Sequence, residues 1–168
     1  TQGTTYQFYV RSNCGDGVLG TWKGPFSFTT QTVVPSPWFE GFSATAPVGF
    51  VNNGFTLSNT VGALLPANGY FYYRNIWSAS TSGGGVTTLN VGPILTGDKL
   101  SFDYIFSKFS AGGSVEENHG NLVVEISTDF GATYSELIVI ESDGGPDEWM
   151  NFETVLSSYV GQIVKLRF

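Results

Sequence analysis

The carboxylate at position 129 is the first group in this sequence whose surroundings raise the question of chemistry. It lies in Ser-Thr-Asp-Phe-Gly-Ala-Thr-Tyr, residues 127–134, between two runs of alternating apolar residues. An aspartate on such a loop could act as a general acid or base. The same spacing predicts a tight turn, in which Asp129 accepts backbone N–H bonds, Gly131 takes a positive φ and Tyr134 begins the next strand. We interpret the motif as a rigid turn.

The single histidine and the single cysteine give little support to catalysis. His119 lies in the polar stretch Glu-Glu-Asn-His-Gly-Asn, and no Gly-x-Ser-x-Gly elbow accompanies it elsewhere. One histidine cannot supply a two-histidine metal site, so we expect a solvated loop residue. Cys14 cannot form an internal disulfide, and no basic or histidine-rich neighbours would activate its thiolate. We expect it to be a small loop residue.

Carboxylates on predicted strands are the remaining candidates for hydrolysis. A glycosidase needs two carboxylates at a defined separation across a sugar, and Glu125, Asp103 and Glu153 are available. Nothing in the sequence indicates that any two of them converge. The acidic run at 141–148 lacks the spacing of an EF-hand, and the Ser-Gly-Gly-Gly-Val run at 82–86 lacks the lysine and helix of a phosphate loop. We therefore predict that the chain is not an enzyme.

The composition indicates an all-β protein with a sizeable core. The 168 residues are 41% hydrophobic and include 22 Gly and 7 Pro, while good helix formers are scarce outside short stretches. The net charge is −7 and the seven Lys and Arg residues are scattered, which excludes the basic stripe that nucleic acid or an anionic membrane surface requires. No apolar run approaches the length of a membrane span.

Short strands at a spacing of about ten residues predict an antiparallel sandwich. Residues 99–104 alternate most clearly: Leu100, Phe102 and Tyr104 should face one way, and Lys99, Ser101 and Asp103 the other. Residues 157–161 should form a turn with one helical turn. The expected strands are 38–42, 54–59, 69–75, 76–80, 86–94, 98–107, 121–127, 134–141, 148–156 and 162–168.

Residues 1–31 predict two strands that cannot bury a core by themselves. They contain Tyr-Gln-Phe-Tyr-Val-Arg-Ser at 6–12 and Gly-Pro-Phe-Ser-Phe-Thr-Thr at 24–30. This stretch resembles the last two strands of a fibronectin type III domain, a resemblance that implies a spacer or binding module whose other strands lie outside this sequence. Residues 32–37, with prolines at 35 and 37, should be a stiff linker.

Residues 38–168 resemble a second family. The opening Trp-Phe-Glu-Gly-Phe, the Leu-Ser-Phe-Asp-Tyr at 100–104, the 124–134 segment and the final Val-Lys-Leu-Arg-Phe carry the resemblance. They are similar to the MAM-like jelly-roll domains of bacterial adhesins, the cleaved-adhesin and choice-of-anchor domains of Bacteroidetes surface proteins. The family implies an antiparallel jelly-roll β-sandwich. Because a further closing strand follows the Arg-Phe end in that family, we expect that strand to be missing here.

The resemblance also implies a structural Ca²⁺ ion held by the glutamate of the opening strand and a carboxylate of the closing strand. Glu40 matches the first of these, and the second is not in the sequence. Calcium takes six to eight oxygen ligands, so Asn75 and either Asn52 or Asn53 could contribute amide oxygens. The alternative for Glu40 is a solvent-facing strand residue, and the sequence does not decide between the two.

Aromatic residues are concentrated in one third of this region. They could pack over the second sheet, or they could form a platform on which sugars stack, and the core interpretation is favoured. The residues are Trp38, Tyr70, Phe71, Tyr72, Tyr73 and Trp77.

These observations predict a non-catalytic adhesion or binding module of a large secreted cell-surface protein, with a glycan or a protein surface as its ligand. The resemblance implies export by type IX secretion, a link to gliding motility or surface attachment, and partners among neighbouring domains or a secretion or surface complex. The alternative is an accessory domain that targets a secreted peptidase or glycoside hydrolase to its substrate.

Overall fold

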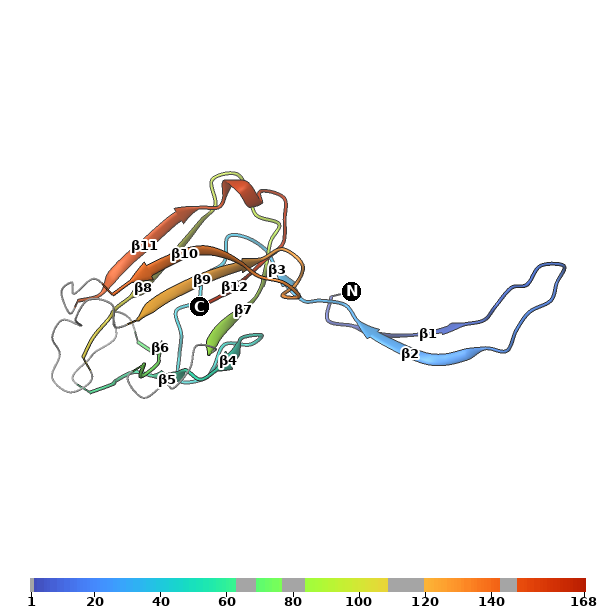
Figure 1. Cartoon of the computed structure of the whole chain (residues 1–168), viewed down its shortest axis with the longest axis horizontal. Coiled ribbons are helices and arrows are strands. Elements are labelled where there is room, and N and C mark those ends of the chain that lie inside the picture. Colours follow the sequence, from blue (N-terminus) through green and yellow to red (C-terminus); the bar gives the residue numbers. More distant parts are fainter. Residues whose placement is uncertain (1, 63–68, 77–83, 109–119, 143–147) are drawn as a thin grey trace. The chain divides into compact units, whose positions relative to one another are not determined.

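The computed structural model describes residues 2–62, 69–76, 84–108, 120–142 and 148–168, and the chain divides into two compact units, Thr1–Val33 and Val34–Phe168. The boundary falls inside the predicted 32–37 linker. Within these ranges the regular elements are strands and one 3₁₀ turn, η1 (Ser157–Tyr159), which confirms the all-β prediction (Figure 1). No helix in them is long and apolar enough to cross a membrane.

The first unit is an antiparallel hairpin of β1 (Thr5–Val10) and β2 (Lys23–Thr29). Its register places Tyr6 opposite Phe28 and Phe8 opposite Phe26, with ring centroids 5.5 Å apart in each pair. The two predicted strands are therefore confirmed. The four rings remain between 40% and 53% exposed, so the hairpin by itself leaves this aromatic face about half uncovered.

From β3 onward, the described residues form three antiparallel sheets. A six-stranded sheet has the order β10–β9–β12–β7–β3, with β4 also pairing with β7, while β8 pairs with β11 and β5 with β6. The strands are β3 (Val33–Val34), β4 (Val51–Asn53), β5 (Thr56–Ser58), β6 (Phe71–Tyr73), β7 (Gly85–Val91), β8 (Lys99–Tyr104), β9 (Asn121–Ser127), β10 (Ser135–Glu141), β11 (Met150–Val155) and β12 (Val164–Arg167).

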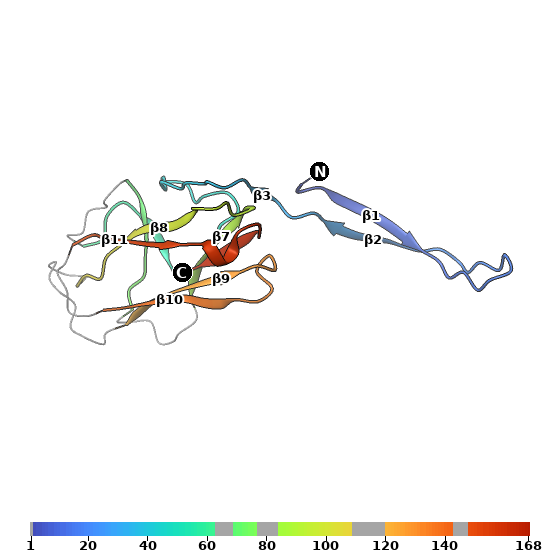
Figure 2. The ribbon, with the colours of Figure 1, turned by 90° about the horizontal axis from the view of Figure 1, so that it is seen from above.

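The core of this unit joins the β8–β11 sheet to the large sheet. Figure 2 shows β8 and β11 as a layer separate from β9 and β10. Leu100 of β8 belongs to the same buried cluster as Val124 and Ile126 of β9 and Val164 of β12. The ring of Phe102 meets that of Phe168 edge-on, with centroids 5.1 Å apart. The arrangement is consistent with a β-sandwich.

The alternation predicted for 99–104 is confirmed, because the even-numbered side chains are buried or half-buried and the odd-numbered ones are exposed. The predicted strand at 38–42 is wrong. The Glu40 carboxylate accepts the backbone N–H of Phe42 at 2.8 Å, and Phe42 has a φ of +50°, so the chain turns there. Conversely, β3 lies inside the predicted linker, where the Val34 carbonyl accepts the N–H of Gly92 at 2.9 Å.

Candidate functional site

The turn between β9 and β10 is built around the side chain of Asp129. Its Oδ1 accepts the hydroxyl of Ser127 at 2.7 Å and the N–H of Thr133 at 2.9 Å, and its Oδ2 accepts the Thr133 hydroxyl at 2.6 Å. The hydrogen bonds from Thr133, and then the one from Ser127, hold the pKa of the Asp129 carboxyl well below its usual range. Phe130 and Gly131 both take positive φ angles. This carboxylate stabilises a turn, as the spacing predicted, and it is a poor proton carrier at neutral pH.

This turn gives a pH-dependent prediction. Because the folded-state pKa of Asp129 is lowered, its stabilisation is present above the unfolded pKa of about 3.9 and is lost as the pH falls below it. The Asp129→Asn variant should unfold at lower urea than the wild type at neutral pH, and the deficit should shrink below about pH 4. Urea titrations at neutral and acidic pH measure it.

Thr128→Ala is the matched control, because it alters the same turn at an exposed side chain for which no hydrogen bond is found in the described residues. A deficit for Asp129→Asn that stays constant from neutral to acidic pH would contradict the electrostatic explanation.

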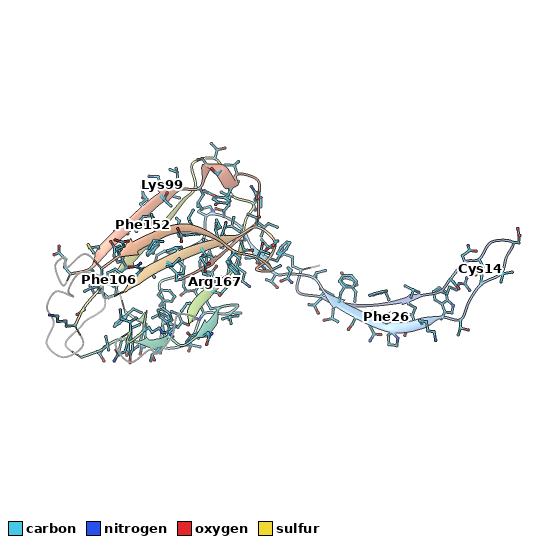
Figure 3. All side chains as sticks on the ribbon, viewed as in Figure 1. Cys14, Phe26, Lys99, Phe106, Phe152 and Arg167 are labelled. Carbon is cyan, nitrogen blue, oxygen red and sulfur yellow. The ribbon has the colours of Figure 1, made fainter. Side chains whose placement is uncertain are left out.

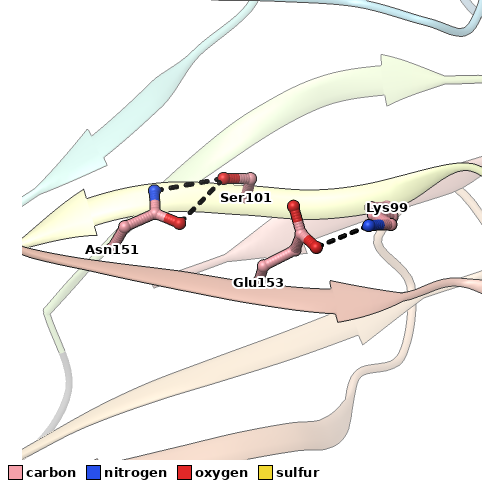
Figure 4. Close-up of polar contacts among 4 residues, drawn as sticks. All are labelled: Lys99, Ser101, Asn151 and Glu153. Carbon is pink, nitrogen blue, oxygen red and sulfur yellow. Dashed lines mark hydrogen bonds and ion pairs between the residues drawn. The ribbon is translucent and has the colours of Figure 1, made fainter.

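The outer face of the β8–β11 sheet carries a ladder of polar side chains (Figure 4). The ammonium of Lys99 lies 2.6 Å from the Glu153 carboxylate, and the amide of Asn151 donates to Asp103 at 2.8 Å and to Ser101 at 3.2 Å. Two of the three carboxylates considered for hydrolysis, Asp103 and Glu153, are thus diagonal neighbours on one exposed face. Each is held by a neighbouring side chain, and exposed cross-strand contacts of this kind contribute only about 0.2–1 kcal/mol each.

The third carboxylate, Glu125, lies on the six-stranded sheet. Its Oε2 is 2.5 Å from Nε of Arg167, whose guanidinium carbon is 4.1 Å from the ring centroid of Tyr134. The hydrogen bond from Arg167 lowers the pKa of the Glu125 carboxyl and raises that of the guanidinium. Figure 3 labels Lys99 on the β8–β11 sheet and Arg167 on the large sheet. Glu125 therefore lies on a different sheet from Asp103 and Glu153 and is held by a cation of its own.

The two residues predicted to bind calcium lie near the β5–β6 sheet. Glu40 is half-buried, and its carboxylate takes the Phe42 N–H described above. Burial raises the pKa of the Tyr72 phenol on β6, and the charge of Glu40 raises it further, which places the two side chains within electrostatic reach. Asn75 is exposed, two residues after β6 ends.

The amide of Asn52 is already used in the turn between β4 and β5. It donates to the Phe55 carbonyl at 2.8 Å and accepts the Phe55 N–H at 3.1 Å. The Tyr72 hydroxyl is buried, and no hydrogen-bond partner for it is found among the described residues. The residues that the structure describes contain no group of three or more His, Cys, Asp or Glu side chains placed to hold a metal ion.

The aromatic residues of this region pack against one another. Phe71 is buried and meets Trp149 edge-on at 5.5 Å between centroids. The Tyr72 ring meets Phe42 edge-on at 5.4 Å. Trp38, Tyr70 and Tyr73 are half-buried. This arrangement favours the core interpretation over a sugar-stacking platform, while Trp77 lies outside the described residues.

Two other side chains in the second unit are far more exposed. Phe39 is 87% exposed and Val48 is 92% exposed, and the sequence reasoning singled out neither. The exposure of Phe39 could have been predicted from alternation, because every second side chain of an extended segment points to the same side. Trp38, Glu40 and Phe42 are half-buried, and the residue between the first two of them points outward.

Cys14 is an exposed free thiol in the loop between β1 and β2, as expected. His119 lies outside the described residues, as does most of the acidic run at 141–148. Comparison of the chain with protein-family models, with curated proteins and with solved structures finds no match.

Proposed function

We propose that this chain is a non-catalytic binding or adhesion part of a large secreted cell-surface protein. The observation that carries the proposal is that four of its carboxylates are already bound by neighbouring side chains. Asp129, Glu125, Asp103 and Glu153 could have served acid–base chemistry, and each is held by side chains of its own turn or sheet. A scaffold whose polar side chains stabilise strands and turns suits a binding module better than an enzyme.

The ligand in this proposal is a glycan or a protein surface. The exposed Phe39 and Val48 in the second unit offer an apolar contact, and the uncovered rings of the first unit offer faces of the kind that stack on sugars. The sequence resemblances supply the rest of the proposal: a fibronectin type III end followed by a MAM-like jelly roll, export by type IX secretion, and a part in surface attachment or gliding.

Calcium enters the proposal as a structural ion. Glu40 and Asn75 supply oxygen donors only, which suits Ca²⁺ better than a transition metal. The half-buried position of Glu40 near the buried Tyr72 hydroxyl supports a role for that carboxylate beyond a freely solvated strand residue. A bound calcium ion would tie the 38–42 turn to the segment after β6.

The test is a glycan array probed with the whole chain in calcium and in chelator, together with Phe39→Ala and Glu40→Gln variants. We expect binding to a restricted set of glycans, weakened several-fold by Phe39→Ala. Calcium should raise the thermal midpoint of the wild type but not of Glu40→Gln, because an ion that binds only the folded state stabilises it. Gln keeps the oxygen that accepts the Phe42 N–H, so this variant isolates the charge.

Each part of this test has a possible result that contradicts the proposal. Hydrolysis of glycosides or peptides by the purified chain would replace the binding function with an enzymatic one. Unchanged binding in Phe39→Ala would remove the exposed phenylalanine from the ligand site. An equal calcium response in the wild type and in Glu40→Gln would remove Glu40 from the ion site.

A further inference from the structure

The strand β10 forms one edge of the six-stranded sheet. It pairs with β9, and no hydrogen bond from its backbone to any other element is found in the ranges that the structure describes. An edge strand presents a row of N–H and C=O groups on its open side, and an extended chain can pair with them. β10 is seven residues long and reads Ser-Glu-Leu-Ile-Val-Ile-Glu, so it has the length and the composition of such a template.

A bulge in β10 places both of its glutamates on the same face of the sheet. The register shifts between Glu136 and Ile138, so that residues 136, 139 and 141 share one face although their spacing in the sequence is uneven. Both glutamates are exposed, and within the described residues neither has an ion pair. Their cross-strand partners on β9 are every second residue of that strand, which places them on one face: Glu125, Val123 and Asn121.

The other face of β10 continues the core. Ile138 packs against the buried cluster, as does Leu137 at the bulge. A strand added beside β10 would extend this apolar layer with residues of its own that point the same way. On the outer face it would meet the side chain of Val139 between two negative charges, those of Glu136 and Glu141.

We propose that the open edge of β10 binds an extended peptide segment in which three apolar residues are flanked by a basic residue on each side. The two basic residues pair with Glu136 and Glu141, the central residue lies beside Val139, and the other two extend the core layer. A second copy of this chain fits poorly, because antiparallel pairing of two β10 strands about their middle brings Glu136 of one close to Glu141 of the other. This inference is independent of the ligand proposed above.

The test uses a labelled peptide with the core Lys-Val-Ile-Val-Lys and the whole 168-residue chain, with binding measured by fluorescence anisotropy at low salt. Replacing both lysines of the peptide with glutamate should weaken binding on the order of tenfold, since two charge pairs become repulsive. The double variant Glu136→Lys/Glu141→Lys should reverse this preference. Asp16→Lys/Glu148→Lys makes the same change in net charge at two exposed residues that are not part of β10, and it should keep the wild-type preference.

A third peptide separates strand pairing from attraction between charges. It keeps both lysines but carries N-methyl groups on its central amides, so it cannot donate to the β10 carbonyls, and we expect it not to bind. Equal binding of the methylated and unmethylated peptides overturns the proposal, as does equal binding of the lysine and glutamate peptides. Absence of binding by every peptide also overturns it.

Discussion

Replacing Ile126 with alanine should lower the free energy of unfolding of the 34–168 unit by about 2–5 kcal/mol. Ile126 is 2% exposed and lies on β9 in the buried cluster with Leu100, Leu156 and Val164. The shortened side chain loses its burial free energy, and the cavity that it leaves costs more because the surrounding strands collapse only partly. Urea unfolding followed by circular dichroism measures the change.

Two further variants show whether the loss comes from the core. Ile126→Val removes one methylene from the same site and should cost about 0.5–1.5 kcal/mol. Val155→Ala, at a β11 side chain that is 58% exposed, should stay within about 0.5 kcal/mol of the wild type. An Ile126→Ala loss no larger than that of Val155→Ala would show that the β8–β11 layer does not cover this cluster.

Replacing Gly92 with alanine should destabilise the same unit by about 2–6 kcal/mol. Gly92 follows β7 with a φ of +149°, a backbone conformation that side chains rarely tolerate. A Cβ atom there would lie 2.7 Å from the carbonyl oxygen of Gln162 and 2.9 Å from Cα of Ile163. Both are backbone atoms just before β12, so relief of the clash has to move a central strand. The drop in thermal midpoint measures the effect.

Gly97→Ala is the matched comparison for this prediction. Gly97 also has a positive φ, +91°, but nothing lies within 4 Å of its ideal Cβ position. It should show only the backbone cost, about 1–2 kcal/mol. Equal losses at Gly92 and Gly97 would contradict the close approach of β7 to the segment before β12.

Features that depend on neighbours along the chain were predictable from the sequence. The alternation in β8 follows from the period of two of a strand, and the hairpin of β1 and β2 follows from two such runs joined by a loop rich in glycine. The turn at Asp129 belongs to the same class. Its hydrogen bonds reach no further than four residues, so the spacing of Ser127, Asp129 and Thr133 already specified them.

The candidate site was predictable only in part. The sequence named Glu40 through a family resemblance and Asn75 from the oxygen ligands that calcium prefers, and it did not foresee the turn in which the Glu40 carboxylate accepts the Phe42 N–H. It favoured packing over a sugar-stacking platform for the aromatic residues at 38 and 70–77, but it did not show which rings meet. Those contacts join rings from distant segments, such as Phe71 and Trp149.

What the sequence determined by itself is the all-β class, the positions of most strands and the structural nature of the Asp129 turn, since each follows from residues a few positions apart. The tertiary structure decided which strands pair, that Arg167 holds Glu125 across 42 residues, that β10 is an edge, and that Phe39 points outward. The physical reason is that period and propensity fix which way a side chain points along its own strand. Which residue of another strand lies beside that side chain is decided only when distant strands pair and bury a common core.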